Sequence, residues 1–154
     1  MNKQMHSKQA GFTLIELVIV IIILGILAAT AVPKFIDLQG DARGSALKGV
    51  KAALEGAASL TYSRAAIKGT EKEATDSVDD IATVYGYPAY TELKEVAELS
   101  TTDWTIDASG TGVSGAVITA FGAASGSTST CKVTYANAAS SVARPTITVD
   151  ESGC

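Results

Sequence analysis

Histidine and cysteine are scarce in this chain of 154 residues, which has one histidine and two cysteines. The histidine is His6, within the first eleven residues, so a product that loses those residues has no imidazole. Imidazole is the usual side chain for acid–base catalysis near neutral pH and a common zinc ligand. Cys131 and Cys154 have no second cysteine pair nearby and form no Cys-x-x-Cys motif. A P-loop, a Ser-x-x-Lys motif and a nucleophile elbow are also missing from the sequence. We therefore predict no catalytic residue, no cofactor and no metal site, so the chain is not expected to be an enzyme.

Charged residues are also few, at 18% of the sequence against the roughly 25% of an average soluble domain. Lys and Arg number 12 and Asp and Glu 16, giving a net charge of −4 and a pI near 4.9. This is the wrong sign for a nucleic-acid-binding surface, and we exclude nucleic acid as a partner. The mean hydropathy of +0.25 arises between Phe12 and Phe35, because no charged residue occurs from Leu17 to Val32. The remaining sequence has the composition of one soluble domain.

The residues around this apolar segment allow more than one kind of membrane segment. Residues 1–11 include Lys3 and Lys8 but no acidic residue, so the positive-inside rule keeps this end in the cytoplasm. The segment is long enough for a plain membrane anchor, which needs about 20 apolar residues. Residues 29–31 (ATA) also fit the cleavage site of a secretory signal, which would make the rest a secreted soluble binding module. Glu16 counts against a disposable signal, because an acid is costly in an apolar segment.

The start of the apolar segment carries a specific motif. Gly11 is followed by Phe-Thr-Leu-Ile-Glu (12–16), which resembles the signature of type IV prepilins at every position. The resemblance implies that a membrane aspartyl peptidase cleaves after Gly11 and that the new N-terminal residue, Phe12, is methylated. Residues 1–11 then form a cytoplasmic leader similar to the short leaders of type IVa pilins. Residues 24–43 and 62–69 (YSRAAIKG) further resemble the mannose-sensitive haemagglutinin pilin branch.

Glu16 has two interpretations. Thr13 and Glu16 have the spacing of a capping box, in which each side chain satisfies a backbone donor at the start of a helix. Alternatively, a carboxylate in lipid needs a cation, and cleavage after Gly11 creates one in the α-amino group of Phe12. The resemblance implies this second role, with Glu16 of an incoming subunit pairing with the Phe12 amine of a subunit already in the fibre.

A single helix is predicted from Phe12 to about Ala66. Its first part is apolar all round, whereas beyond Pro33 apolar residues recur every three or four positions, as on an amphipathic helix. Pro33 lacks a backbone donor, so we expect the helix to break or kink at Gly25 and Pro33. The resemblance, together with the change in composition near Pro33, implies three parts: a leader (1–11), a hydrophobic membrane and assembly helix (12–38), and a globular head that includes the amphipathic half of the helix (39–154).

The head is predicted to be an antiparallel meander against the helix. Its polar, acidic start at 69–80 indicates a loop, followed by short helices over 78–85 and 90–100. Four short segments rich in β-branched and aromatic residues are predicted strands, at 104–107, 116–121, 132–135 and 146–150.

Three features of the head look like binding sites but have simpler explanations. Residues 110–115 match G-x-G-x-x-G, yet the strand-like AVITAF follows where a dinucleotide site needs a helix. Asp76, Asp79 and Asp80 lack a recognised calcium-ligand spacing, so a solvated loop is expected. Four aromatic residues are expected in the core and not on a sugar-binding surface: Tyr85, Tyr87, Tyr90 and Trp104.

The predicted fold class is α+β, the type IV pilin fold, with a long N-terminal helix packed on a small antiparallel sheet. Cys131 and Cys154 are expected to pair as a structural disulfide, since disulfides persist in oxidising compartments. The resemblance implies the major structural subunit of a type IV pilus, which polymerises through its N-terminal helix into a surface fibre for attachment, agglutination or biofilm formation. A type II secretion pseudopilin, which shares the signature and the long helix, is the alternative.

The resemblance also implies partners and a location. The partners are other pilin subunits in a homopolymer, the prepilin peptidase, the inner-membrane assembly machinery, and a glycan or other surface ligand. Before assembly the chain would cross the inner membrane once, with a cytoplasmic N-terminus. Afterwards it would belong to the extracellular pilus of a Gram-negative-type cell.

Overall fold

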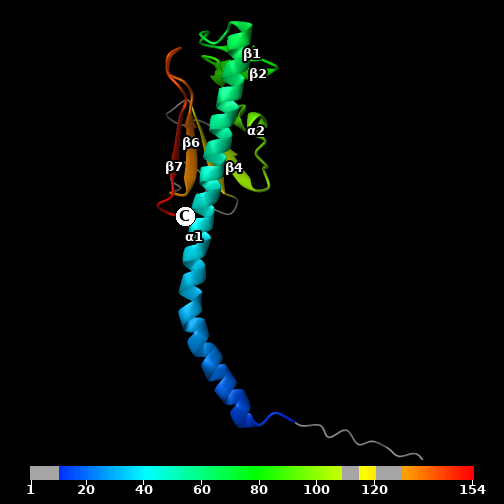
Figure 1. Cartoon of the computed structure of the whole chain (residues 1–154), viewed down its shortest axis with the longest axis vertical. Coiled ribbons are helices and arrows are strands. Elements are labelled where there is room, and N and C mark those ends of the chain that lie inside the picture. The colour runs from blue at the N-terminus through cyan, green and yellow to red at the C-terminus, as the bar shows by residue number, and fades with distance from the viewer. Residues whose placement is uncertain (1–10, 109–114, 121–129) are drawn as a thin grey trace, which may run out of the picture. The chain divides into compact units, whose positions relative to one another are not determined.

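The computed structural model describes residues 11–108, 115–120 and 130–154 (Figure 1). The chain divides into two compact units between Leu38 and Gln39. Each unit is described by itself below.

Helix α1 runs without interruption from Leu14 to Lys68, so the prediction of one long helix is confirmed. Gly69 ends it with a φ of +79°. The Gly69 amide donates to the Ala66 carbonyl and the Thr70 amide to the Ala65 carbonyl, at 3.2 and 3.0 Å, which is the hydrogen-bond pattern of a Schellman cap.

The helix is not interrupted at Gly25 or Pro33, because both residues lie inside the continuous α1. The prediction of a break is therefore wrong, and the kink stays a prediction. A proline removes one backbone donor and disturbs the preceding turn. The helical turns on either side of Pro33 nevertheless keep their conformation. The correction is that the proline is accommodated within the helix and does not end it.

In the unit formed by residues 39–154, α1 presents one face to a hydrophobic core. The buried positions recur every three or four residues, which confirms the amphipathic pattern: Leu47, Val50, Leu54, Ala58, Thr61 and Ala65. Leu47, Val50 and Leu54 belong to one core cluster with residues of the sheet and the intervening segment, among which Ile118, Val133 and Tyr135 are fully buried.

The main sheet consists of four antiparallel strands in the order β4-β5-β6-β7. Their bounds are Trp104–Asp107 (β4), Gly115–Ala120 (β5), Lys132–Ala136 (β6) and Thr146–Asp150 (β7). Burial alternates along β6, where Val133 and Tyr135 face the core. The predicted antiparallel meander and its four strands are therefore confirmed, and β4, β6 and β7 can be followed beside α1 in Figure 1.

A second, three-stranded antiparallel sheet occupies a region where the sequence predicted a helix. Its strands are β1 (Asp76–Val78), β2 (Ile81–Val84) and β3 (Tyr87–Pro88), so the prediction of a short helix over 78–85 is wrong. The physical reason is the backbone conformation of the turn, because Asp79 and Asp80 have φ values of 51° and 66°, which are left-handed and not helical. Val78 pairs with Ile81 across these two residues, which is the geometry of a two-residue hairpin with a type I′-like turn.

Gly86 shows why the second turn of this sheet needs glycine. Its φ is +79°, and Tyr85 beside it is also left-handed at 51°. A Cβ at Gly86 would lie 2.9 Å from the Cα of Glu71, closer than the backbone tolerates. The glycine therefore lets the β2–β3 turn pack on the start of the preceding loop.

The helix predicted over 90–100 is shorter than expected. Helix α2 comprises only Leu93–Val96. Glu98, with a φ of 49°, turns the chain soon after this single helical turn. The pattern came from Leu93, Val96, Ala97 and Leu99, and the two leucines are buried in the core while the other two are partly buried against it. Packing, and not helix length, therefore explains their spacing.

Candidate functional site

The N-terminal segment begins with a capping box. The carboxylate of Glu16 accepts hydrogen bonds from both the backbone N–H and the hydroxyl of Thr13, each at 2.8 Å. In return, the Glu16 amide donates to the Thr13 hydroxyl oxygen at 3.3 Å. Two backbone donors at the helix start are thereby satisfied. The capping interpretation of Glu16 thus describes a real contact within one chain.

Phe12 lies just outside this cap, with 93% of its surface exposed. The backbone around Gly11 also has open space, because a Cβ placed there would meet no atom within 4 Å. The bond between the two residues is therefore reachable by another protein. Cleavage there, methylation of Phe12, and pairing of its amine with Glu16 of a second subunit stay predictions.

The first part of α1 exposes apolar side chains on every face. From Leu14 to Leu38 the large apolar residues whose side chains are described are all exposed, Val18 being the least so at 38%. In length and composition this stretch of the helix suffices to cross a membrane. A continuous apolar surface of this extent needs lipid or other protein surfaces around it.

Two small residues within this stretch, Gly25 and Thr30, differ from the large apolar residues around them. A Cβ at Gly25 would meet no atom within 4 Å, so the space beside this residue is open. The hydroxyl of Thr30 donates to the carbonyl of Leu27 at 2.9 Å, which keeps its polar group satisfied inside the helix. The sequence prediction did not include this role of Thr30, although a threonine in an apolar helix is a signal for such a bond.

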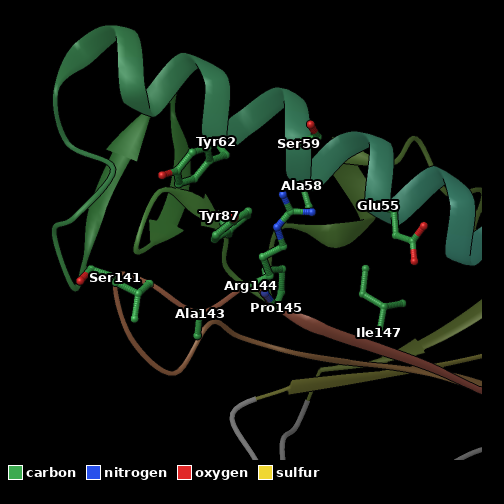
Figure 2. Close-up of a pocket in the computed structure, with 11 residues that line it drawn as sticks. Glu55, Ala58, Ser59, Tyr62, Tyr87, Ser141, Ala143, Arg144, Pro145 and Ile147 are labelled. Carbon is green, nitrogen blue, oxygen red and sulfur yellow. The ribbon is translucent and has the colours of Figure 1, made fainter.

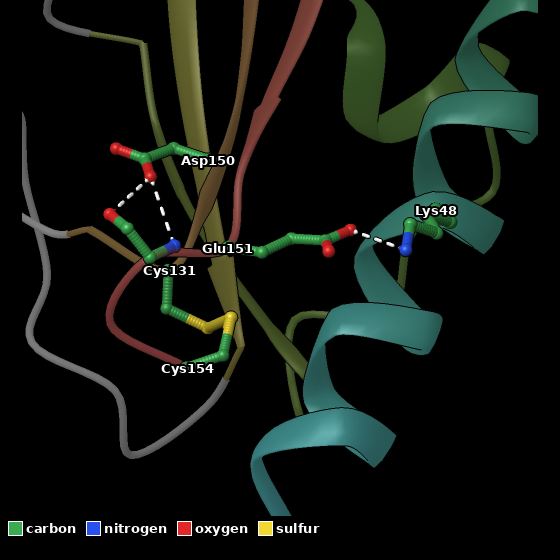
Figure 3. Close-up of polar contacts among 6 residues, drawn as sticks. Lys48, Cys131, Asp150, Glu151 and Cys154 are labelled. Carbon is green, nitrogen blue, oxygen red and sulfur yellow. Dashed lines mark hydrogen bonds and ion pairs between the residues drawn. A yellow bond between two sulfur atoms is a disulfide. The ribbon is translucent and has the colours of Figure 1, made fainter.

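Cys131 and Cys154 form the predicted disulfide, with their Cα atoms 4.7 Å apart (Figure 3). It joins the start of β6 to the segment after β7, across a sequence separation of 23 residues. A turn beside it is held by Asp150, whose carboxylate accepts from the hydroxyl and amide of Ser152 at 2.7 and 3.1 Å. These two hydrogen bonds lower the pKa of Asp150.

The segment after β7 also contacts α1. The ammonium of Lys48 lies 3.0 Å from the carboxylate of Glu151 (Figure 3). Gly44, one turn earlier, is buried, and a Cβ there would lie 3.4 Å from the Glu151 side chain. The glycine gives the carboxylate room to reach Lys48. Neither this pair nor the role of Gly44 could be predicted from the sequence. Both depend on the segment after β7, which the disulfide holds, lying against α1.

The acidic residues at 76–80 are used within the fold. Asp79 pairs with Arg64 at 2.9 Å, and Asp76 lies 3.6 Å from the ammonium of Lys68. The backbone N–H of Ser77 is the main cause of the lowered pKa of Asp76. Within residues 11–108, 115–120 and 130–154, no three His, Cys, Asp or Glu side chains are grouped as a metal site.

The glycine motif and the aromatic residues also have structural explanations. Residues 110–114 lie outside the described part of the chain, but Gly115 begins β5, so a strand follows the motif as predicted. A Cβ at Gly115 would collide with the carbonyl oxygen of Tyr135. Trp104 and Tyr90 are partly buried against the core as expected. Tyr87 instead stacks on Tyr62, a contact that the sequence prediction missed.

Comparisons with known proteins agree with the N-terminal motif. Residues 6–32 match the prokaryotic N-terminal methylation motif. The chain is 53% identical over 47 residues to the major component of the type IV narrow pilus of Thermus thermophilus, a match covering 30% of this chain and 40% of that protein. It is 51% identical over 43 residues to the type IV major pilin of Myxococcus xanthus, a match covering 28% of this chain and 20% of that protein. It is also 55% identical over 49 residues to the type IV major fimbrial protein of Dichelobacter nodosus, a match covering 32% of this chain and 29% of that protein.

These matches confirm that the chain carries the N-terminal motif of type IV prepilins and is similar to major pilins of the type IVa-like kind. The chain covers less than half the length of each of these three relatives. No solved structure matches it. The long helix and the small antiparallel sheet nevertheless form an α+β, type IV pilin-like arrangement.

Proposed function

We propose that this chain is a type IV pilin precursor, the major structural subunit of a pilus. The observation that carries the proposal is the methylation motif at residues 6–32, placed directly on a helix whose apolar surface is exposed from Leu14 to Leu38. Relatives with 51–55% identity over their matched segments are themselves major pilus components. A subunit that polymerises through this helix accounts for both features.

The proposed mechanism begins in the membrane. Residues 1–11 serve as a cytoplasmic leader, which a prepilin peptidase removes after Gly11 before Phe12 is N-methylated. The apolar stretch of α1 then holds the precursor in the inner membrane, with residues 39–154 outside. During assembly, side chains of neighbouring helices replace lipid around the stretch. The driving contacts are van der Waals packing and polar pairing, since lipid and leucine are equally apolar.

Glu16 gives this assembly a register. In the isolated chain its carboxylate accepts hydrogen bonds from Thr13, and one oxygen, Oε2, receives both. The second oxygen has no hydrogen bond from a described residue, so the capping box leaves it able to accept from the Phe12 amine of a neighbour. Capping and intermolecular pairing are therefore compatible, which removes the conflict between the two interpretations of this residue.

The finer parts of the proposal concern location and use. The fibre would extend from a Gram-negative-type cell and support attachment, agglutination or biofilm formation, as in the mannose-sensitive haemagglutinin branch that residues 24–43 and 62–69 resemble. The assembly machinery of the inner membrane would supply subunits to its base.

The mature N-terminus tests the proposal against its two rivals. Fibres sheared from cells that make this chain should contain it, and its intact mass should show loss of residues 1–11 and gain of one methyl group. A secreted soluble module would begin at Val32, and retention of the leader in fibres would contradict the proposal. A pseudopilin would be processed in the same way but would form no long surface fibre at native expression, which electron microscopy of the same cells reveals.

A further inference from the structure

The C-terminal tail, residues 151–154, lies against one face of helix α1. A Cβ at Gly40 would lie 3.4 Å from the backbone carbonyl carbon of the last residue of the chain. One turn later, a Cβ at Gly44 would lie 3.4 Å from the carboxyl carbon of Glu151. Another turn on, the ammonium of Lys48 lies 3.0 Å from the same carboxylate, as Figure 3 shows. Positions 40, 44 and 48 share one face of the helix because they are spaced by four residues, so the tail follows this face over two turns.

The stretch of α1 from residue 40 to residue 46 depends on this contact. Glycine is, after proline, the residue least favourable to a helix interior, and the stretch contains Gly40 and Gly44. Among the described residues, the core cluster includes none from 40 to 46, and its first member along α1 is Leu47. Gly44 is nevertheless buried, and the three atoms nearest to a Cβ there all belong to Glu151. The tail therefore supplies packing that this part of the helix does not obtain from the core.

The tail is itself fastened beside the start of β6. The amide of Gly153 donates to the carbonyl oxygen of Thr130 at 3.0 Å, and a Cβ at Gly153 would collide with the Thr130 side chain. The next residue, Cys154, is joined to Cys131 by the disulfide. Strand β7 and its ladder to β6 end at Asp150. The tail thus begins where the ladder ends, and the disulfide is what fastens it covalently to the rest of the head.

The non-covalent contacts of the tail are weak by comparison. The pair between Lys48 and Glu151 is exposed, with 67% and 37% of the two side chains accessible to solvent, and exposed ion pairs contribute little to stability. One backbone hydrogen bond reaches Thr130, whereas the others given by the tail end within it or at Asp150. A chain end without a firm attachment is usually poorly ordered. Loss of the disulfide therefore releases the tail and removes the support of residues 40–46.

Farther along, α1 has supports that do not involve the tail. Leu54 is buried in the core cluster, with 1% of its surface exposed. Tyr62 stacks on Tyr87 of β3, with the two ring centroids 4.7 Å apart (Figure 2). Residues 54–65 of the helix are therefore held by the core and by this stacked pair. Within the head, α1 thus has two parts whose supports are separate.

We propose that the C-terminal tail is a redox-sensitive clamp, which keeps residues 40–46 of α1 helical only while Cys131 and Cys154 are joined. A dithiol reductant opens the clamp by supplying two electrons. Its first thiolate attacks one cysteine sulfur to form a mixed disulfide, and its second closes the reductant's own disulfide. The two protons of the dithiol end on Cys131 and Cys154, which are left as thiols. The open clamp interrupts the helix just after its apolar stretch, and a newly made chain is in this state until its cysteines are oxidised.

Hydrogen–deuterium exchange of the full chain in detergent micelles, with and without dithiothreitol, tests the clamp. We expect the backbone amides of residues 40–46 to exchange at least tenfold faster in the reduced chain, because they open locally. At the same short labelling times, residues 54–65 should stay protected in both states. The double variant Cys131→Ser/Cys154→Ser should match the reduced chain without any reductant. Gly153→Ala keeps both cysteines but displaces the tail, so it should speed exchange at residues 40–46 in the oxidised chain.

Helix propensity gives a second measurement on the same stretch. In the reduced chain, Gly44→Ala should slow exchange at residues 40–46 about fourfold, because alanine favours a helix interior much more than glycine does. Gly56→Ala is the matched control, since it lies on the same helix and a Cβ there would meet no atom within 4 Å. It should leave the exchange of residues 40–46 unchanged.

Three results would overturn the clamp. The first is equal exchange at residues 40–46 in the oxidised and reduced chains. The second is loss of protection at residues 54–65 at the same labelling times as at 40–46, which would show that the disulfide holds the whole head and not one stretch of helix. The third is a reduced chain in which Gly44→Ala has no more effect on residues 40–46 than Gly56→Ala.

Discussion

The hydroxyl of Tyr135 on β6 donates a 2.7 Å hydrogen bond to the carbonyl oxygen of Pro88 on β3. This single contact joins the four-stranded sheet to the three-stranded one across 47 residues of sequence. Tyr135 is fully buried, and Pro88 is buried as well. A polar bond in such surroundings fixes how the two sheets meet, because neither group can turn to water instead.

Tyr135→Phe is therefore expected to lower the free energy of unfolding by about 1–3 kcal/mol, because it leaves the buried Pro88 carbonyl without its donor. Urea denaturation of the chain at neutral pH measures the change. Tyr85→Phe is the matched control, since the hydroxyl of Tyr85 makes no hydrogen bond to a described residue. Equal effects of the two substitutions would contradict the importance of this bond.

Stability should also fall at alkaline pH. Burial, and to a lesser extent the neighbouring Tyr87, raise the pKa of Tyr135 in the folded chain. Above pH ~10 an unfolded tyrosine loses its proton while the folded one keeps it, so the unfolded state binds fewer protons and the free energy of unfolding decreases as pH rises. The decrease between pH 9 and 11 should be steeper in the parent chain than in Tyr135→Phe. Parallel curves would show that Tyr135 does not contribute to it.

Substitutions at Glu16 separate its two roles. Glu16→Gln keeps an oxygen that can accept the Thr13 hydrogen bonds, but it removes the charge that would pair with a Phe12 amine. We expect Glu16→Gln and Glu16→Ala to insert in the membrane normally and both to form few fibres, measured as sheared pilin per cell. Thr13→Ala, which loses only the hydroxyl of the cap, should assemble better than either. Normal fibre yield in Glu16→Gln would favour capping as the whole role of this residue.

The disulfide is expected to contribute on the order of 3 kcal/mol to stability, through the loop entropy it removes from the unfolded chain. The double substitution of Cys131 and Cys154 by serine should therefore unfold at a markedly lower urea concentration. Lys48→Gln in the oxidised chain should have a much smaller effect, because exposed ion pairs contribute roughly 0–1 kcal/mol. Free thiols titrating in unreduced, folded protein would contradict the pairing.

A fragment beginning at Gln39 is expected to fold by itself. The described core residues of the head all lie at or beyond Leu47, and the apolar surface from Leu14 to Leu38 is left out. We expect a soluble chain with mixed helix and strand by circular dichroism, monomeric by light scattering at low concentration and unable to form fibres. An unfolded fragment, or one that still polymerises, would show that the core or the assembly surface lies elsewhere.

The sequence predicted best where one physical signal dominates. The long helix and the strands of the main sheet follow from apolar spacing of three to four and from short β-branched runs. The prepilin motif is specific because Gly11, Phe12 and Glu16 occur together. The disulfide could be predicted without structural information, since two cysteines allow only one pairing within the chain.

The sequence failed where local signals compete with tertiary contacts. Residues 78–85 form a hairpin because Asp79 and Asp80 adopt left-handed backbone conformations. Aspartate adopts this conformation only occasionally, so its presence in the sequence did not predict the turn. Pro33 stays within a helix that neighbouring turns maintain. The ion pair between Lys48 and Glu151 could not be predicted, because its two residues come from distant parts of the chain.

The ring closed by the disulfide changes how the head would respond to a protease. Val142, 94% exposed, lies in the segment between β6 and β7, and is therefore inside the ring from Cys131 to Cys154. A cut beside Val142 would add the mass of one water but release no fragment, because both pieces stay joined through the two sulfur atoms and the β6–β7 ladder. A nicked subunit would remain one covalent molecule, and only reduction followed by unfolding would separate its parts.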